Sequence, residues 1–310
     1  MIKVAETIIP IFMLIMLGGG ARHFGFMRPE FMAAANRLVF YLAIPALVFR
    51  ALSRASLRAA FDPWSVVMMG VAVFMVGGLG LLSVSLVGKK DGPRQGTFTQ
   101  TTIHGNLGYI GLAVAYYYLD ESGFARAGMM LGFLMILQNL LGVVLLQYFC
   151  LVQEGGARRL RRMLISVILN PVILAALTGM LFNLSALPLP SVLDRFLLVL
   201  SGLALPMGLL LIGASISFAL LKRWLLLAGL SAFYKLLLLP ATGLLLFRLA
   251  GVGEQNYVPG LILLAAPTAT LTYVMAREMG GLVELSVASI SLSTLLSAFT
   301  YALWLGWLAG

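Results

Sequence analysis

The segment "QTTIHGNLGYIGLAVAYYYLDE", residues 100–121, is apolar enough for a membrane helix, yet its first twelve residues hold a His, an Asn and three glycines. Glycine is a poor helix former, and polar side chains are costly in lipid. Unwound backbone is tolerated at membrane depth only where protein or a water-filled cavity satisfies its free N–H and C=O groups. The segment therefore predicts a helix that is interrupted inside a protein, beside a polar site.

The rest of the chain has the composition of an integral membrane protein. Of its 310 residues, 61% are hydrophobic and only 10% are charged, whereas roughly 25% of an average soluble domain is charged. No connection between apolar segments is long enough for a soluble domain, so the chemistry lies in or beside the bilayer. The net charge of +10 comes mainly from Lys and Arg in short connections. Such a distribution indicates membrane topology rather than nucleic-acid binding.

Apolar runs of about 20 residues predict ten spans, and therefore an all-α polytopic membrane protein. Their approximate limits are 4–21, 33–53, 64–88, 98–119, 124–150, 164–184, 193–220, 223–248, 256–277 and 283–308. The connections after odd-numbered spans hold 13 of the 21 Lys and Arg, including "ARRLRR" at 157–162, and the opposite side holds 7. Positive charge favours the cytoplasmic side, which predicts both termini on the non-cytoplasmic side of the inner (cytoplasmic) cell membrane. Arg50, Arg54 and Arg58 run against this rule.

The chain contains an internal repeat at an offset of 161 residues. This offset places three first-half prolines on second-half prolines, namely Pro10 on Pro171, Pro29 on Pro190 and Pro45 on Pro206. The chain therefore divides into two predicted five-helix repeats, 1–155 and 156–310. Because five is odd, the second repeat enters the membrane from the opposite side. Inverted repeats of this kind are mainly an architecture of secondary transporters.

The opening segment has a counterpart in the second repeat. The same offset pairs Asn106 with Pro267, so "HGNLGYIGLAVAY" at 104–116 corresponds to "AAPTATLTYVMAR" at 265–277. These are spans 4 and 9, and both contain helix-disrupting residues. Interrupted segments at corresponding positions of two repeats point to a transport site. The N-termini of half-helices carry partial positive charge, which favours an anionic substrate.

Five stretches, in order along the chain, resemble the auxin efflux carrier family, which includes plant PIN proteins and bacterial organic-acid permeases. They are "IIPIFMLIMLGGGARHFGF" at 8–26, "NRLVFYLAIPALVF" at 36–49, "NPVILAALTGMLFNL" at 170–184, "LPMGLLLIGASI" at 205–216 and "AAPTATLTYVMAREMGG" at 265–281. The resemblance covers essentially the whole chain.

The resemblance implies ten helices in two inverted repeats, with helices 4 and 9 broken and crossing near the bilayer centre. It also implies a scaffold of spans 1, 2, 6 and 7, a mobile transport domain of spans 3–5 and 8–10, and a homodimer formed through the scaffold. Family members carry small organic anions, which bind at the crossover. Asn106 and Pro267 match the crossover Asn and Pro of the family, whereas Ala113 and Leu271 replace a usual Pro and a frequent Asn. The expected site is therefore less polar and less symmetric than the family pattern.

The predicted substrate-binding residues lie at the two interruptions and in neighbouring spans. They are Gly105, Asn106, Gly108, Gln138, Asn139, Lys235, Pro267, Thr268 and Thr270. Asn106 either donates its amide to a substrate carboxylate or caps the second half-helix. Gln138 and Asn139 are adjacent and face about 100° apart on a helix, so we expect one at the cavity and the other at a neighbouring helix. The threonines either contact the substrate or bond back to freed carbonyls.

Two candidate ionisable side chains, His104 and Lys235, lie deep within spans. His104 is a candidate proton relay, because an unperturbed imidazole titrates near neutral pH; the alternative is a hydrogen bond to the helix break. Lys235 is the one basic residue deep in a span. It either attracts an anion, replaces a cation, caps a helix end or extends toward the interface. No Asp or Glu occurs in a span core, which leaves uniport, H⁺ coupling through His104, or Na⁺ at backbone carbonyls.

These features predict a secondary or facilitative transporter of a small organic anion, working by elevator-like alternating access, rather than an enzyme. The sequence contains no nucleotide-binding loop, and it predicts neither a cofactor nor a metal site. Two alternatives remain open. A membrane-embedded enzyme would need paired carboxylates, a His/Asp metal set or a Ser–His arrangement at one depth. A transporter-like sensor would bind the anion without moving it.

Overall fold

A computed structural model describes residues 2–54, 62–87, 91–150, 169, 171–185 and 187–308 of the protein, and most of these residues are helical. The helices of the first half are α1 (Ile2–His23), α2 (Pro29–Leu38), η1 (Val39–Ala43), α3 (Ile44–Arg54), α5 (Pro63–Val87), α6 (Gly92–Ile103), η2 (Leu107–Gly111), α7 (Leu112–Tyr118) and α8 (Glu121–Cys150). Those of the second half are α10 (Pro171–Leu184), α11 (Ser191–Ser201), α12 (Ala204–Ser215), α13 (Phe218–Arg223), α14 (Leu225–Phe233), η3 (Tyr234–Leu238), α15 (Leu239–Leu249), α16 (Glu254–Leu264), α17 (Leu271–Glu278) and α18 (Val283–Leu308).

Seven stretches within the described ranges are long and apolar enough to cross a membrane, which confirms the predicted all-α, multi-pass class. They are Ile2–His23, Pro29–Arg54, Pro63–Leu86, Glu121–Cys150, Ser191–Ser215, Leu225–Leu249 and Val283–Leu308. Predicted spans 98–119 and 256–277 are each divided into shorter helices. Predicted span 164–184 is represented by α10, and its first residues lie outside the described ranges, as do Arg58 and the cluster at 157–162.

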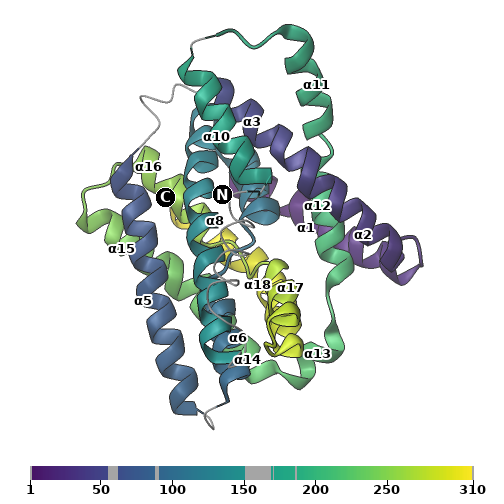
Figure 1. The fold of residues 1–310 in the computed structure, drawn as a ribbon, viewed down its shortest axis with the longest axis vertical. Coiled ribbons are helices and arrows are strands. Elements are labelled where there is room, and N and C mark those ends of the chain that lie inside the picture. The colour runs from purple at the N-terminus through teal and green to yellow at the C-terminus, as the bar shows by residue number, and fades with distance from the viewer. Residues whose placement is uncertain are drawn as a thin grey trace.

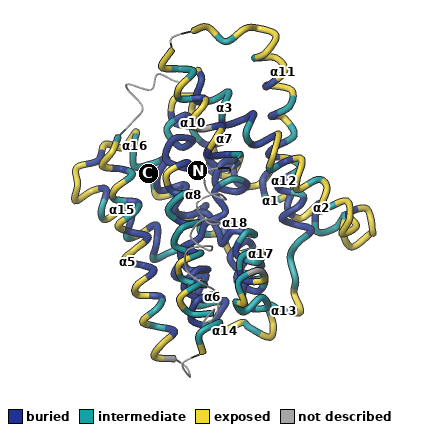
Figure 2. Tube along the Cα trace, in the orientation of Figure 1, coloured by how far each residue is buried: buried dark blue, intermediate teal, exposed yellow. Residues whose placement is uncertain are grey.

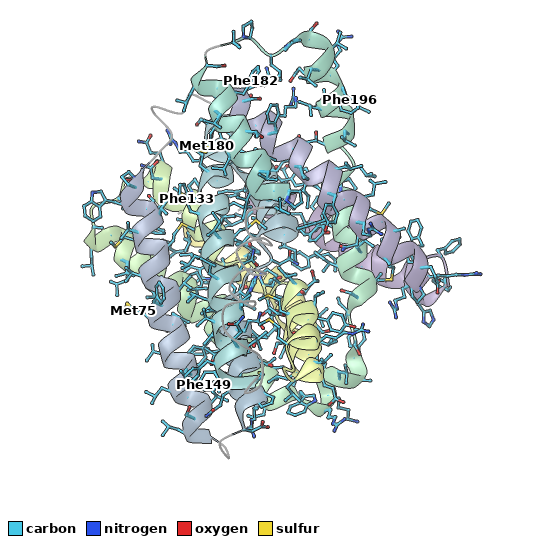
Figure 3. All side chains as sticks on the ribbon, in the orientation of Figure 1. Met75, Phe133, Phe149, Met180, Phe182 and Phe196 are labelled. Carbon is cyan, nitrogen blue, oxygen red and sulfur yellow. The ribbon has the colours of Figure 1, made fainter. Side chains whose placement is uncertain are left out.

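Apolar side chains cover the outside of the helical bundle. Figure 1 places α5 on one flank and α2 on the other, and Figure 2 shows exposed residues along both. Met75, Phe133 and Phe196, labelled in Figure 3, are among the exposed large hydrophobic residues. Buried hydroxyl side chains instead occupy α6 and α18, at Thr97, Thr99, Thr101, Thr102, Ser286, Ser289, Ser291, Ser293, Thr294 and Ser297. This distribution suits a lipid solvent, in which polar groups are satisfied inside the protein.

Two helix pairs approach each other closely at glycines. A Cβ atom on Gly18 of α1 would overlap the backbone of Leu210 in α12. A Cβ atom on Gly179 of α10 would lie 3.0 Å from the carbonyl oxygen of Phe49 in α3. Small residues at such crossings let membrane helices pack backbone against backbone. Each pair joins a helix of the first half to a helix of the second.

The π-helix η3 arises beside Pro240. Proline has no N–H, so the carbonyl of Leu236, four residues earlier, lacks its helical donor. The indole Nε1 of Trp304 in α18 donates to that carbonyl instead, at 2.9 Å. A π-helical turn contains an extra residue and rotates the following side chains relative to an unbroken α-helix. Lys235 lies in this turn.

Two of the arginines that run against the charge rule have a carboxylate partner. Arg50 in α3 donates from Nε to Oδ1 of Asp194 at 2.8 Å and from Nη2 to Oδ2 at 3.2 Å. Arg54 Nη1 lies 3.7 Å from the same carboxylate. This bidentate pair joins α3 to α11. Asp194 therefore neutralises part of the positive charge on that side.

Asp120 caps the N-terminus of α8. Its Oδ1 accepts a hydrogen bond from the backbone N–H of Gly123 at 2.8 Å, and the hydroxyl of Ser122 donates to Oδ2 at 3.1 Å. The bond from Gly123 is the main cause that holds the pKa of the Asp120 carboxyl below its ordinary value. A side chain at this position satisfies N–H groups that the first helical turn leaves free.

Asp120→Ala should lower the free energy of unfolding by less than about 1 kcal/mol, the low end for a lost cap, because the carboxylate is solvent-exposed. Thermal unfolding in detergent measures this change. Because the folded-state pKa is depressed, the stabilisation is complete at neutral pH. It disappears as pH falls from the ordinary value, about 3.9, through the folded-state pKa. Asp120→Asn keeps an acceptor oxygen and should lose the acid dependence; equal midpoints for wild type and Asp120→Ala at neutral pH would contradict the assignment.

Candidate functional site

The first interruption lies at residues 104–106, between α6 and η2. The backbone N–H of His104 donates to Gln100 O at 3.0 Å, which is the last helical hydrogen bond of α6. The backbone of His104 itself is extended. Leu107 N–H bonds to Gly105 O at 2.9 Å, and the π-helix η2 begins. Asn106 stands at the N-cap position, but its side chain makes no capping hydrogen bond. The capping alternative for Asn106 is therefore wrong.

The second interruption lies at residues 265–270, between α16 and α17. Ala265 still donates to Leu261 O at 2.9 Å. Pro267 has no N–H and cannot continue the helix. The next turn begins where Thr272 N–H bonds to Ala269 O at 3.1 Å.

The two interruptions meet by backbone hydrogen bonds. Gly105 and Thr268 form an isolated antiparallel bridge. Asn106 N–H donates to Pro267 O at 2.6 Å, and Ala269 N–H donates to His104 O at 2.9 Å. Two extended segments thus satisfy each other inside the bundle, as buried backbone requires.

Side chains satisfy further backbone groups at the junction. Gly105 N–H donates to Oε1 of Gln138 in α8 at 2.9 Å. Thr268 N–H donates to Ser293 Oγ at 3.1 Å, and Thr268 Oγ1 donates to Thr101 O at 3.0 Å. The bonding-back alternative therefore applies to Thr268, which helps to hold α6 against the second interruption.

Lys235 satisfies the end of α16. Its Nζ donates to the carbonyl of Leu264 at 2.7 Å, and the side chain is fully buried. A Cβ atom on Gly105 would lie 3.2 Å from both Cε and Nζ of Lys235. Glycine at 105 therefore permits the close approach, whereas a Cβ on Gly108 would meet nothing nearer than 3.8 Å.

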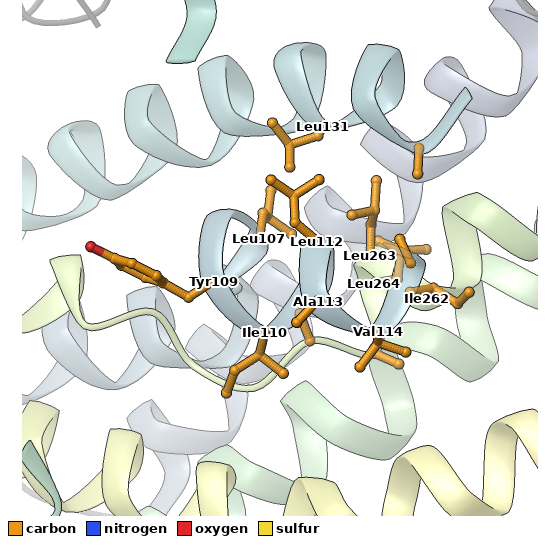
Figure 4. Packing of buried hydrophobic residues seen from close by; sticks show 14 of the residues in the cluster. Leu107, Tyr109, Ile110, Leu112, Ala113, Val114, Leu131, Ile262, Leu263 and Leu264 are labelled. Atoms are coloured by element: carbon orange, nitrogen blue, oxygen red, sulfur yellow. The ribbon is translucent and has the colours of Figure 1, made fainter. Parts of the chain in front are cut away.

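Apolar packing fixes the half-helices around the junction. Figure 4 shows Leu107 of η2 and Leu112 of α7 close to Leu131 of α8, with Leu263 and Leu264 of α16 beside α7. Ala113, where the resemblance implies a proline, is buried within α7. The helix therefore continues past residue 113, and the interruption depends on residues 104–106.

A cavity of about 380 Å³ lies beside the junction. Its wall combines both interruptions with α2, η1, α3, η2, α8, α10, α12 and α17. The lining residues are Met32, Ala33, Asn36, Phe40, Ile44, His104, Gly105, Asn106, Leu107, Gly108, Tyr109, Met135, Gln138, Asn139, Val172, Leu211, Ile212, Ser215, Ala269, Thr270, Leu271, Tyr273 and Val274. Most of these side chains are apolar, and none of the described lining residues is Lys, Arg, Asp or Glu.

Four residues that line the cavity carry buried polar atoms without a hydrogen-bond partner. Within the described ranges, the buried atoms Asn106 Nδ2, Gln138 Nε2, His104 Nδ1 and Asn139 Oδ1 have no hydrogen-bond partner. Two of them are amide N–H₂ groups, which donate hydrogen bonds and accept none. A buried donor without a partner costs about 1–3 kcal/mol. A ligand with acceptor oxygens would recover that cost.

The cavity contains most of the predicted site residues. His104, Gly105, Asn106, Gly108, Gln138, Asn139 and Thr270 line it, whereas Pro267, Thr268 and Lys235 do not. Gln138 and Asn139 both belong to the wall, and Gln138 also contacts the first interruption. The expectation that only one of them faces the cavity is therefore wrong.

Sequence reasoning missed the wall contributed by α2 and α12. Asn36 lies there, and its Oδ1 accepts a hydrogen bond from the Tyr109 hydroxyl at 2.6 Å. Tyr109 and Tyr273 also line the cavity. Both sit next to the interruptions, which is the only sequence signal for them.

The sequence model of a family described as "Membrane transport protein" matches residues 3–305. The chain belongs to this membrane transport protein family. The match confirms the family resemblance found in the sequence. Among the described residues of this family member, no three His, Cys, Asp or Glu side chains are grouped to hold a metal ion.

Three relatives of this family member align with nearly the whole chain. An uncharacterized transporter of Methanothermobacter thermautotrophicus is 27% identical over 303 residues, 96% of each chain. A protein of Rhizobium meliloti named "Putative malonate transporter" is 27% identical over 318 residues, covering 97% of this chain and 94% of the relative. An uncharacterized transporter of Methanocaldococcus jannaschii is 25% identical over 310 residues, 98% of each chain.

Proposed function

We propose that this family member is a secondary or facilitative transporter that binds a small organic anion in the cavity beside the two interruptions. The observation that carries the proposal is the pair of unsatisfied amide donors, Asn106 Nδ2 and Gln138 Nε2, on two residues that line a mostly apolar cavity. A substrate carboxylate accepts hydrogen bonds from such donors, and charge-assisted bonds are the strong ones. Gly105, Gly108, Asn139, Thr270, Pro267 and Thr268 shape or support the same site.

The proposed architecture has ten spans in two inverted repeats, 1–155 and 156–310. The two glycine contacts support it, because Gly18 and Gly179 are 161 residues apart, and so are their partners Phe49 and Leu210. Shifting one contact by the repeat offset therefore produces the other. The bond between Asn106 and Pro267 joins two positions at the same offset, as expected near a pseudo-twofold axis.

Elevator-like alternating access follows from the family resemblance. In this proposal, spans 1, 2, 6 and 7 form a scaffold and a homodimer interface, and spans 3–5 and 8–10 move with the substrate. The cavity supports this division, because α2 and α12 of the scaffold and α8 and α17 of the moving domain contribute to its wall. Movement between these groups would expose the site alternately on the two sides.

We place both termini on the non-cytoplasmic side of the inner membrane. The exposed wall residues include Ala33 and Asn36 on α2 and Val274 on α17. Arg37 and Arg277 lie close to them in sequence, on the side that the charge rule assigns to the cytoplasm. In this proposal the cavity opens toward the cytoplasm.

The wall favours an anion with one carboxylate and an apolar body. One carboxylate suffices to engage the donors of Asn106 and Gln138. A second carboxylate would meet apolar side chains such as Phe40, Ile212 and Leu271, and a buried charge without a partner is strongly unfavourable. Phenylacetate represents the favoured class, and malonate, named for the Rhizobium relative, represents the other.

Counterflow in proteoliposomes tests this proposal. Vesicles loaded with unlabelled acid at pH 8, with protein-free vesicles as the blank, should take up labelled phenylacetate at least about tenfold faster than malonate. Such a ratio corresponds to about 1.4 kcal/mol. Faster exchange of malonate would show that the substrate is a dicarboxylate, and it would still support a transporter. Binding without exchange would indicate a sensor, and conversion of the acid to a new compound would indicate an enzyme.

A further inference from the structure

Lys235 is the most unusual charged group in the described part of the membrane region. It is fully buried, it lies behind Gly105 rather than in the cavity wall, and its one recorded acceptor is the Leu264 carbonyl. No carboxylate of the described residues forms an ion pair with it. Burying a basic group without an acidic partner is costly, so its position calls for a specific role.

The Leu264 carbonyl, which accepts the hydrogen bond from Lys235, indicates which kind of ligand this position suits. Leu264 is the last residue of α16, and its carbonyl has lost its helical donor because Thr268 N–H bonds to Ser293. The C-terminal end of a helix carries partial negative charge. In transporters with discontinuous helices, unwound carbonyls and half-helix C-termini coordinate the coupling Na⁺. The side chain of Lys235 lies at such a half-helix C-terminus, where it donates to the last carbonyl of α16.

The geometry also links this place to the proposed anion. The Cε and Nζ atoms of Lys235 approach the backbone of Gly105, and Asn106, the next residue, lines the cavity. Residues 104–106 therefore separate the amine from the substrate. When protonated, Lys235 would stabilise a bound anion without touching it, because a charge acts over a longer distance in a protein interior than in water.

We infer that Lys235 is a cation tethered to the protein, which takes the place of a coupling metal ion at the junction and makes anion exchange independent of Na⁺. This inference rests on the proposed function for its transport consequence. It leaves His104, whose Nδ1 has no recorded partner, as the remaining candidate for H⁺ coupling. The role of Lys235 at the C-terminal end of α16 can be tested without a transport assay.

Because Lys235 takes the place of Na⁺, replacing Na⁺ by choline should change wild-type phenylacetate counterflow by less than about twofold. Constant ionic strength keeps the screening of charges unchanged in this comparison. Lys235→Met should lower the exchange by about tenfold or more, and Na⁺ or methylammonium should restore part of it. Lys222→Met removes an exposed lysine of α13 and should exchange like wild type. If wild-type exchange requires Na⁺, the inference about Lys235 is wrong, whereas the proposed transporter function still holds.

Thermal unfolding in detergent, without substrate, gives an independent result. Lys235→Met should unfold at a lower temperature than wild type, and Na⁺ or methylammonium should raise the midpoint of the variant but not of wild type. If Lys235→Met yields no folded protein, Lys235→Gln, which keeps a donor but no charge, takes its place. Midpoints equal to wild type, or the same cation effect on both proteins, would overturn the inference even if no organic anion is transported.

Discussion

Asn106→Ala is expected to lower phenylacetate counterflow by about ten- to hundredfold and to leave thermal unfolding unchanged. A hydrogen bond to a charged group contributes about 1.5–3 kcal/mol, which accounts for the loss of binding. Stability is spared because Asn106 Nδ2 has no partner within the described ranges, and the bond to Pro267 comes from the backbone. A site residue whose loss costs function but no stability differs from a structural one.

Two variants complete this test. Asn106→Asp places a carboxylate beside the substrate anion and should reduce exchange further than Ala does, because like charges repel. Ser215→Ala changes another wall residue, whose hydroxyl already donates to Ile212 O at 2.7 Å, and should exchange within about twofold of wild type. Normal exchange by Asn106→Ala would remove Asn106 from the site and leave the fold unaffected.

Gly18→Ala should destabilise the protein by roughly 1–3 kcal/mol or prevent its folding, as overpacking does. The added Cβ would overlap the backbone of Leu210, which, unlike a flexible side chain, cannot rotate away. α1 and α12 would have to separate along their whole contact. The yield of monodisperse protein and its unfolding midpoint in detergent measure the effect.

The same helix supplies the control. A Cβ on Gly20, two residues further along α1, would meet nothing within 4 Å. Gly20→Ala should therefore be neutral, or stabilising by up to about 1 kcal/mol through lost flexibility of the unfolded chain. Gly179→Ala, with its 3.0 Å approach to Phe49 O, should be intermediate. Equal stability of Gly18→Ala and Gly20→Ala would show that the α1–α12 crossing tolerates separation.

The positions of the two interruptions were predictable because backbone chemistry is local. Glycines at 105 and 108 weaken a helix, and Pro267 removes a donor, wherever the chain lies. The repeat offset then identified Asn106 and Pro267 as counterparts, and their backbones are hydrogen-bonded in the structure. Composition and apolar run length similarly predicted the membrane class, since both depend only on the solvent.

The partners of individual side chains were not predictable. Lys235 faces Leu264 because Pro240 and the π-helical turn η3 alter the face on which it lies, and an ideal helical period does not anticipate that change. The contact between Asn36 and Tyr109 depends on how two distant helices cross. Long-range packing decided which polar residues entered the cavity wall.

The crossed pairing of α1 with α12 and of α10 with α3 also sets the order in which the protein can mature. When the ribosome has completed the first repeat, α1 has no partner for its glycine face, and α3 still lacks α10. Both surfaces remain open until more than half of the chain has been synthesised. Nascent chains that stop before α12 therefore leave the glycine face of α1 without its partner helix, although α10 can already pack on α3.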